Sequence, residues 1–187
     1  MTALLDRLTA AYGRLRRATP GSMLIRGTVF VAGFLALCVA MPAGLLSAQT
    51  VLAAAVLALV PAALPGSFAV MLAQLLTVAL WVIGTLTGPI ALGSVLMLAA
   101  ALYLQHTAAA LAAVLPLDSF AAPAVVLGWL ARTAGVLAAG LGLGLLVGLL
   151  GPAGTTGALS YVATGAGLVL AAVTGILLAW QYRRRSR

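Results

Sequence analysis

The chain has 187 residues, of which 64% are hydrophobic and only 6% are charged. A soluble domain is about 45–50% apolar and about 25% charged, and a chain this short cannot bury the excess in a core. The composition therefore excludes water as the main solvent and predicts an all-α, polytopic transmembrane helical bundle. Arginine supplies all ten basic residues, against two aspartates. Arginine, alanine, glycine and proline have GC-rich codons, so this composition indicates a high-GC bacterial source.

The basic residues are concentrated at the two ends of the chain, with Arg26 counted in the N-terminal group. The lipid-facing basic residues that we predict are Arg7, Arg14, Arg16, Arg17, Arg183, Arg184 and Arg185. Nucleic-acid binding needs a basic face on a folded soluble module, so we do not expect it. Arginine-rich flanks prefer the cytoplasm and the anionic headgroups of the inner leaflet. We therefore expect a bacterial plasma-membrane protein with both termini in the cytoplasm.

Residues 1–20 form the first predicted unit, a short cytoplasmic amphipathic helix. Leucine, alanine and tyrosine recur at helical spacing over residues 2–18, and arginines cover much of the other face. This pattern predicts a helix that lies in the membrane interface, and docking on a protein partner is the alternative. The Pro20-Gly21 pair ends this helix. We expect the apolar run that follows to be an uncleaved first span rather than a signal peptide.

Residues 21–182 form a single predicted transmembrane domain, which a basic cytoplasmic tail follows at 183–187. Five breaks divide its apolar sequence, and each contains proline near glycine, serine or aspartate, residues that favour turns. The breaks predict six spans, at residues 23–41, 46–64, 67–87, 90–115, 122–150 and 156–181. Two cytoplasmic ends require an even number of crossings, which six satisfies, and four is the alternative. The second span is short and contains Pro61, so it could instead form part of a re-entrant hairpin.

Small residues at intervals of four predict where the helices pack. Apolar burial gives helices little reason to associate in lipid, so faces that allow close backbone approach specify the contacts. The helix-packing residues that we predict are Gly140, Gly144, Gly148, Ala163, Gly167, Ala171 and Gly175. Span one carries a similar series that includes Ala32, Ala36 and Ala40. We expect packing within the chain, and a face for another subunit or for self-association is the alternative.

Polar residues inside the apolar spans are the candidates for chemistry, because such groups are costly at membrane depth. The candidate intramembrane polar site comprises Gln74, Tyr103, Gln105 and His106. We interpret His106 first as a structural histidine; an element of a solute path and a ligand shared with another subunit are the alternatives. Asp118 and Arg132 are predicted to form a charge pair near the inner interface. A snorkelling arginine or a contact to a substrate anion would also explain Arg132.

Catalysis is disfavoured by the groups that the sequence lacks. The two aspartates are far apart in the chain, no nucleophile motif is present, and one cysteine and one histidine cannot build a metal or haem site. We therefore expect no enzyme activity, no cofactor and no metal. The function that we expect is that of a non-catalytic accessory, assembly or scaffold subunit that acts through helix–helix contacts. A channel or carrier for a small neutral or apolar solute is the alternative.

Overall fold

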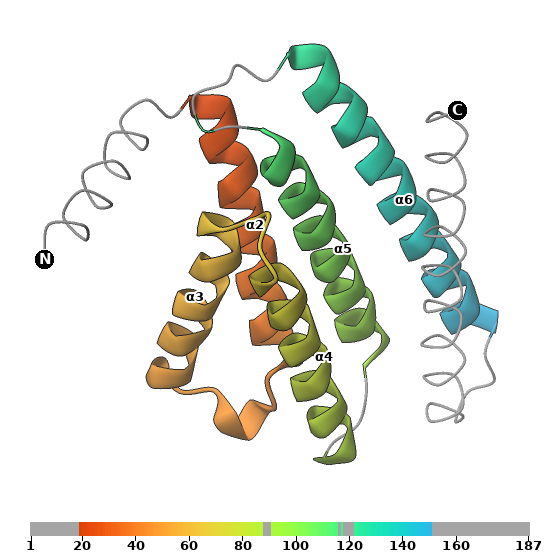
Figure 1. Cartoon of the computed structure of the whole chain (residues 1–187). Coiled ribbons are helices and arrows are strands. Elements are labelled where there is room, and N and C mark those ends of the chain that lie inside the picture. The colour runs from red at the N-terminus through yellow and green to blue at the C-terminus, as the bar shows by residue number, and fades with distance from the viewer. Residues whose placement is uncertain (1–18, 88–90, 116, 118–121, 151–187) are drawn as a thin grey trace, which may run out of the picture.

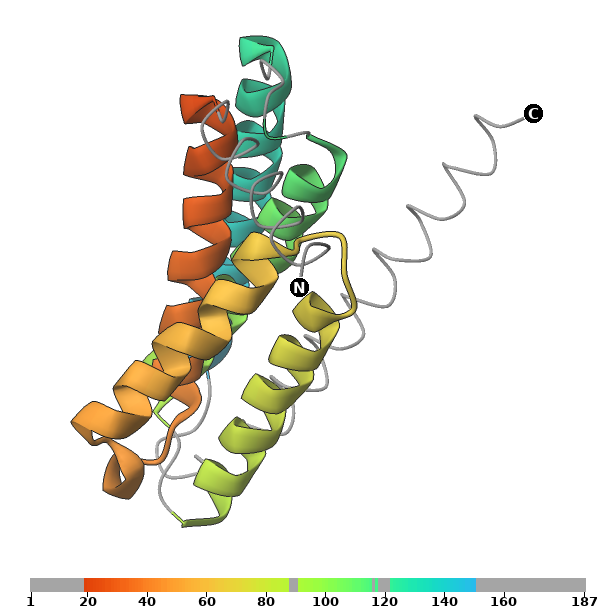
Figure 2. The same cartoon turned by 60° about the vertical axis from the view of Figure 1, so that its left-hand side comes forward.

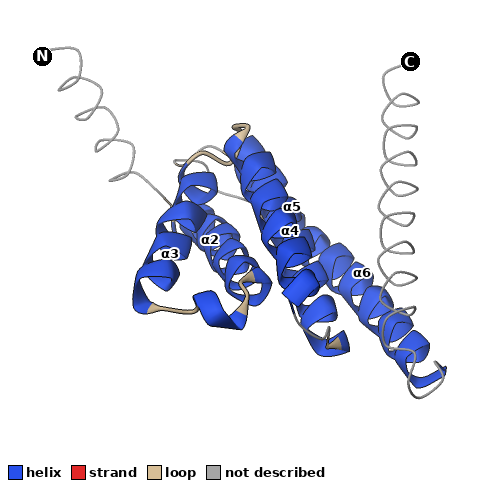
Figure 3. Ribbon diagram, turned by 90° about the horizontal axis from the view of Figure 1, so that it is seen from below, coloured by secondary structure: helices blue, strands red, loops and turns tan. Residues whose placement is uncertain are grey.

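The computed structural model describes residues 19–87, 91–115, 117 and 122–150, whose regular elements are all helical (Figures 1 and 3). The elements are α2 (Pro20–Ala40), the 3-10 turn η1 (Ala43–Leu45), α3 (Ala48–Ala63), α4 (Ala69–Thr87), α5 (Leu92–Val114) and α6 (Pro123–Leu150). These helices match the first five predicted spans closely, because the proline-containing breaks stop them. The predicted interfacial helix, the last span and the lipid-facing arginines at both ends lie outside the described residues.

Consecutive helices run in alternate directions, so the bundle has two ends (Figures 1 and 2). One end holds the start of α2 and the α3–α4 turn, where the Arg26 guanidinium donates a hydrogen bond to the Ala63 carbonyl at 3.0 Å. The α5–α6 connection returns to the same end. There the Thr19 amide and the Ser22 hydroxyl each donate to the Leu117 carbonyl at 2.9 Å. We call this end of the bundle the Arg26 end.

Helix α2 is the centre of the bundle and contacts α3, α4 and α5. Ala36 and Ala40 of α2 pack in one cluster with Leu98 and Ala101 of α5, and Ala32 is also buried. Such small side chains let two helix backbones approach closely, which favours dispersion contacts along the whole interface. The three alanines of the series predicted for span one therefore lie in the core.

The large apolar side chains point away from this core, which is the reverse of a water-soluble bundle. Among the described residues, ten of the fifteen buried hydrophobic side chains are alanine, whereas Leu24, Leu52 and Leu86 are 71%, 67% and 80% exposed. Water would disfavour such an extensive apolar surface, and hydrocarbon would accept it. Helices α2, α4, α5 and α6 are each long and apolar enough to cross a membrane. The chain therefore has the build of an integral membrane protein.

The expected count of six spans is not supported by the described residues. Helix α3 has 16 residues and is about 24 Å long, whereas a hydrocarbon core is roughly 30 Å thick. Its start is delayed to Ala48 because Ser47 caps it, with the Thr50 amide donating to the Ser47 hydroxyl at 3.3 Å. The four long helices fit the four-span alternative, and the predicted span at 156–181 lies outside the described part of the chain.

Candidate functional site

The four residues of the predicted intramembrane polar site lie on two helices and face different ways. Gln74 belongs to α4, and the other three belong to α5. Gln105 is 1% exposed, whereas the neighbouring His106 is exposed and Tyr103 is half-buried. An α-helix has 3.6 residues per turn, so adjacent residues such as Gln105 and His106 point in different directions. The predicted site is therefore divided into a buried amide and an outward-facing imidazole.

Gln105 packs directly onto Gly33 of α2. A Cβ atom at Gly33 would lie 2.6 Å from Gln105 Nε2 and 3.2 Å from its Cδ, so glycine is the residue that leaves room for the amide. Gln105 Oε1 is buried and has no hydrogen-bond partner in the described structure. On the side that faces α2, this close fit leaves no space for a solute beside Gln105.

Gln74 joins α4 to α5. Its Nε2 donates a hydrogen bond to the Leu102 carbonyl at 3.3 Å, one turn before His106. One turn further along α4, Thr77 is 1% exposed and its hydroxyl donates to the Ala73 carbonyl at 2.8 Å. Both side chains thus bond to the main chain, and the hydrogen bond of Gln74 does not go to His106. Sequence reasoning missed Thr77 because threonines are scattered through all the spans.

His106 lies near the middle of α5 with its side chain exposed. Ala99, Ala110 and Ala113 are exposed with it at helical spacing, and Tyr103 lies half-buried beside them. We call these five residues the His106 face. A neutral imidazole can both donate and accept a hydrogen bond, so His106 is able to bond to a polar group on a helix that packs against this face.

Two residues of the predicted glycine series on α6 lie against α5. A Cβ atom at Gly144 would collide with the Leu96 side chain, and one at Gly148 would collide with Leu92, whereas a Cβ atom at Gly140 would meet nothing within 4 Å. Part of the series therefore packs within the chain. The corresponding residues predicted for the last span lie outside the described residues, and these are Ala163, Gly167, Ala171 and Gly175.

The predicted charge pair near the inner interface is only half described. Arg132 is exposed on α6, and Asp118 lies outside the described residues. The other charged side chain in the described part of the chain is Arg26, which is half-buried and donates to the Ala62 and Ala63 carbonyls at 3.3 and 3.0 Å. The sequence could have distinguished Arg26 from the arginines of the N-terminal tail, because Arg26 lies six residues after Pro20, inside the first predicted span.

Polar side chains of the described residues form hydrogen bonds between helices. Among them, no group of three His, Cys, Asp or Glu residues is placed to hold a metal ion. Comparisons of the chain with protein-family models, with curated proteins and with solved structures find no match. The residues themselves must therefore indicate the function.

Proposed function

We propose that this protein is a non-catalytic integral membrane subunit with an accessory, assembly or scaffold role, which acts through helix–helix contacts inside the bilayer. The observation that carries the proposal is the exposed side chain of His106 near the middle of α5. Polar groups at membrane depth are expensive and generally pair with one another or with backbone carbonyls. An exposed imidazole in an apolar span therefore calls for a covering helix.

The rest of the His106 face suits such a helix. Ala99, Ala110 and Ala113 present little more than main chain, so a second helix can approach closely. In the most apolar 18-residue stretch of each helix, 11% of the residues of α4 and 6% of those of α6 are buried by other described residues. Among the described helices, α6 lies at the edge of the bundle (Figures 1 and 3). In the part of the chain that the structure describes, α4 and α6 thus leave apolar surface for another membrane subunit or for a second copy.

A channel or carrier for a small neutral or apolar solute has less support. It would need Gln105 and His106 to line one path, whereas Gln105 packs onto Gly33 and His106 is exposed. The amide of Gln74 is also engaged, by the Leu102 carbonyl. These contacts are those of polar residues that hold helices together.

The proposal predicts that His106→Leu and Ala110→Leu reduce association without unfolding the chain. Interhelical hydrogen bonds in membranes contribute about 0.6–2 kcal/mol, so loss of the His106 bond should weaken association about threefold to thirtyfold. Particle mass in mild detergent, measured by light scattering after size exclusion, reports association, and thermal denaturation reports folding. Ala131→Leu, which changes another exposed alanine on α6, is the matched control and should leave both unchanged.

Two outcomes would contradict the assembly proposal. The first is that the wild-type protein has the mass of a single chain at every concentration. The second is that His106→Leu lowers the thermal stability of the isolated chain. The second result would mean that another part of the same chain covers His106.

We also propose that the Arg26 end faces the cytoplasm of a bacterial cell. The support is that arginine-rich sequence precedes α2, and that such flanks stay inside. Helix α3 leads from one end of the bundle to the other. It starts just after η1, close to Pro42, which lies beside Gly84 near the end of α4. It ends beside Arg26. The arginine-rich sequence at both ends supports a cytoplasmic position for both termini, and α3 with its flanking residues then returns the chain to the cytoplasmic side between α2 and α4.

Cysteine labelling tests this topology. In a Cys38→Ala background, Gln49→Cys places a thiol at the exposed start of α3, and Phe68→Cys places one in the exposed α3–α4 turn. A maleimide that cannot cross membranes should label Gln49→Cys on intact cells and Phe68→Cys only after permeabilisation. Labelling of both from one side would show that α3 does not cross, as in the re-entrant alternative. Labelling in the reverse pattern would contradict the orientation.

A further inference from the structure

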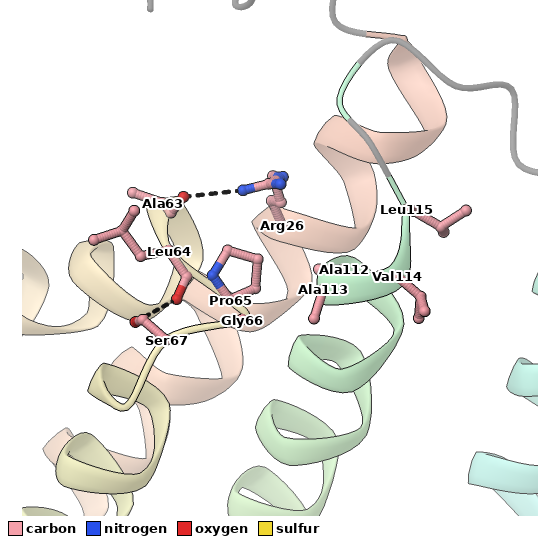
Figure 4. Close-up of a pocket in the computed structure, with 10 residues that line it drawn as sticks. All are labelled: Arg26, Ala63, Leu64, Pro65, Gly66, Ser67, Ala112, Ala113, Val114 and Leu115. Carbon is pink, nitrogen blue, oxygen red and sulfur yellow. Dashed lines mark hydrogen bonds between the residues drawn. The ribbon is translucent and has the colours of Figure 1, made fainter. Parts of the chain in front are cut away.

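A pocket of about 420 Å³ opens at the Arg26 end of the bundle (Figure 4). Three segments that are distant in sequence form it, namely Arg26 of α2, the α3–α4 turn with the end of α3, and the last turn of α5 with Leu115. Its lining includes Arg26, Pro65, Ser67, Ala112 and Ala113. Its volume is in the range of pockets that hold small ligands, about 300–1,000 Å³.

Arg26 is the charged residue of this pocket. Its Nη1 donates to the Ala62 and Ala63 carbonyls, at 3.3 and 3.0 Å, and thereby satisfies two carbonyls at the end of α3. Figure 4 shows the guanidinium held against this helix end. A guanidinium has five N–H donors, and no described hydrogen bond uses Nε or Nη2. No acidic side chain is present among the described residues to neutralise it.

Apart from Arg26 and Ser67, the residues that line the pocket are apolar. Pro65, Ala112 and Ala113 contribute apolar lining between Arg26 and α5 (Figure 4). The Ser67 hydroxyl is already engaged, since it donates to the Leu64 carbonyl at 2.7 Å and accepts from the Ala69 amide at 3.2 Å. The pocket thus combines one held cation with apolar walls. An amphipathic anion would match both features.

We propose that this pocket binds the phosphate of an anionic phospholipid. Arginine recognises phosphate through paired, charge-assisted N–H donors, and a half-buried guanidinium gives stronger bonds than a fully hydrated one. Arg26 lies six residues after Pro20, or about 9 Å along α2, at the end of the bundle that we propose faces the cytoplasm, where the headgroup phosphates of the inner leaflet lie. The glycerol then lies beside Pro65 and Ala113. The inference rests on that placement and not on the assembly role.

The test is a lipid titration of the isolated full-length chain in mild detergent, with thermal stability as the readout. Short-chain phosphatidylglycerol, short-chain phosphatidylcholine and inorganic phosphate are added separately. We expect phosphatidylglycerol to raise the melting temperature saturably, and the other two to have little effect. Removal of charge-assisted bonds in Arg26→Gln should weaken the apparent affinity for phosphatidylglycerol about tenfold or more. Arg132→Gln, which removes an exposed arginine from α6, is the matched control and should respond as the wild type does.

A second variant guards against a folding defect in Arg26→Gln. Ala113→Leu keeps the guanidinium and occupies part of the pocket from an exposed position on α5. It should retain the wild-type melting temperature without lipid and lose the response to phosphatidylglycerol. An unchanged lipid response in both variants would overturn the proposal, and so would an equal response to inorganic phosphate, because the ligand would then be a free anion. Because Ala113 also belongs to the His106 face, the titration is run at a concentration at which light scattering gives the mass of a single chain. Failure of the assembly proposal then leaves its outcome unchanged.

Discussion

Replacement of Gly33 with leucine is expected to prevent α2 and α5 from packing and to leave no stable, monodisperse protein. A Cβ atom there would lie 2.6 Å from Gln105 Nε2, and Gln105 is 1% exposed, so its amide has little free volume to move into. Overpacking of a close-packed core costs about 1–3 kcal/mol and occasionally more. The smaller Gly33→Ala change should fall within this range, and leucine should exceed it. Thermal denaturation and size-exclusion chromatography in mild detergent measure both effects.

A control on the same helix isolates the cause of this loss. A Cβ atom at Gly27 would meet nothing within 4 Å, so Gly27→Leu should behave as the wild type does. Gln105→Ala should rescue Gly33→Ala, because residues in direct contact give non-additive free energies. Equal stability of Gly33→Leu and Gly27→Leu would contradict the close contact between α2 and α5.

The limits of the described helices could be predicted from the sequence because proline and glycine act locally. Proline has no N–H to donate and disfavours a helical conformation of the residue before it, so the breaks are visible in any apolar sequence. The predicted span 122–150 corresponds to α6 at Pro123–Leu150, and 90–115 corresponds to α5 at Leu92–Val114. Elements of this kind require no knowledge of the tertiary contacts.

The predicted second span was longer than α3, because the length of an apolar run is not the length of a helix. Residues 46–64 are apolar nearly throughout, but η1 takes up Ala43–Leu45 and the Ser47 cap starts the helix at Ala48. Leu46 adds to the hydrophobicity of the run but lies before the helix begins. A capping serine inside an apolar run was the available signal.

The candidate site could be predicted only as a set of residues. In a soluble helix, alternation of polar and apolar residues marks the buried face, but nearly every position of α5 is apolar. Alanine does not mark the face either, since Ala108 and Ala109 are buried whereas Ala110 and Ala113 are exposed. The sequence therefore identified Gln105 and His106 as costly groups without showing that they face different surroundings. Tertiary packing against Gly33 makes that distinction.

Replacement of Gly144 with leucine is expected to release α6 from α5. A Cβ atom at Gly144 would collide with Leu96 Cδ2 and lie 3.4 Å from its Cγ. Few side chains of α6 are buried by the other described residues, since 6% of its most apolar stretch is buried. Alanine at this position should cost less than about 1 kcal/mol, because the Leu96 methyl can rotate away, whereas leucine should cost about 1–3 kcal/mol. Thermal denaturation of the full chain in mild detergent measures the loss. Leu96→Ala should restore stability to Gly144→Leu by moving the bulk from one helix to the other.

Gly140→Leu distinguishes packing within the chain from packing between subunits. It lies one turn from Gly144 on the same helix, and a Cβ atom there would meet nothing within 4 Å. If the series serves α5 alone, Gly140→Leu should be neutral or stabilising by up to about 1 kcal/mol, because leucine favours helix more than glycine does. If another chain packs on the series, Gly140→Leu should reduce particle mass while the isolated chain stays folded. Equal destabilisation by Gly140→Leu and Gly144→Leu would contradict the α5–α6 contact as the reason for these glycines, because Leu96 lies opposite only the second of them.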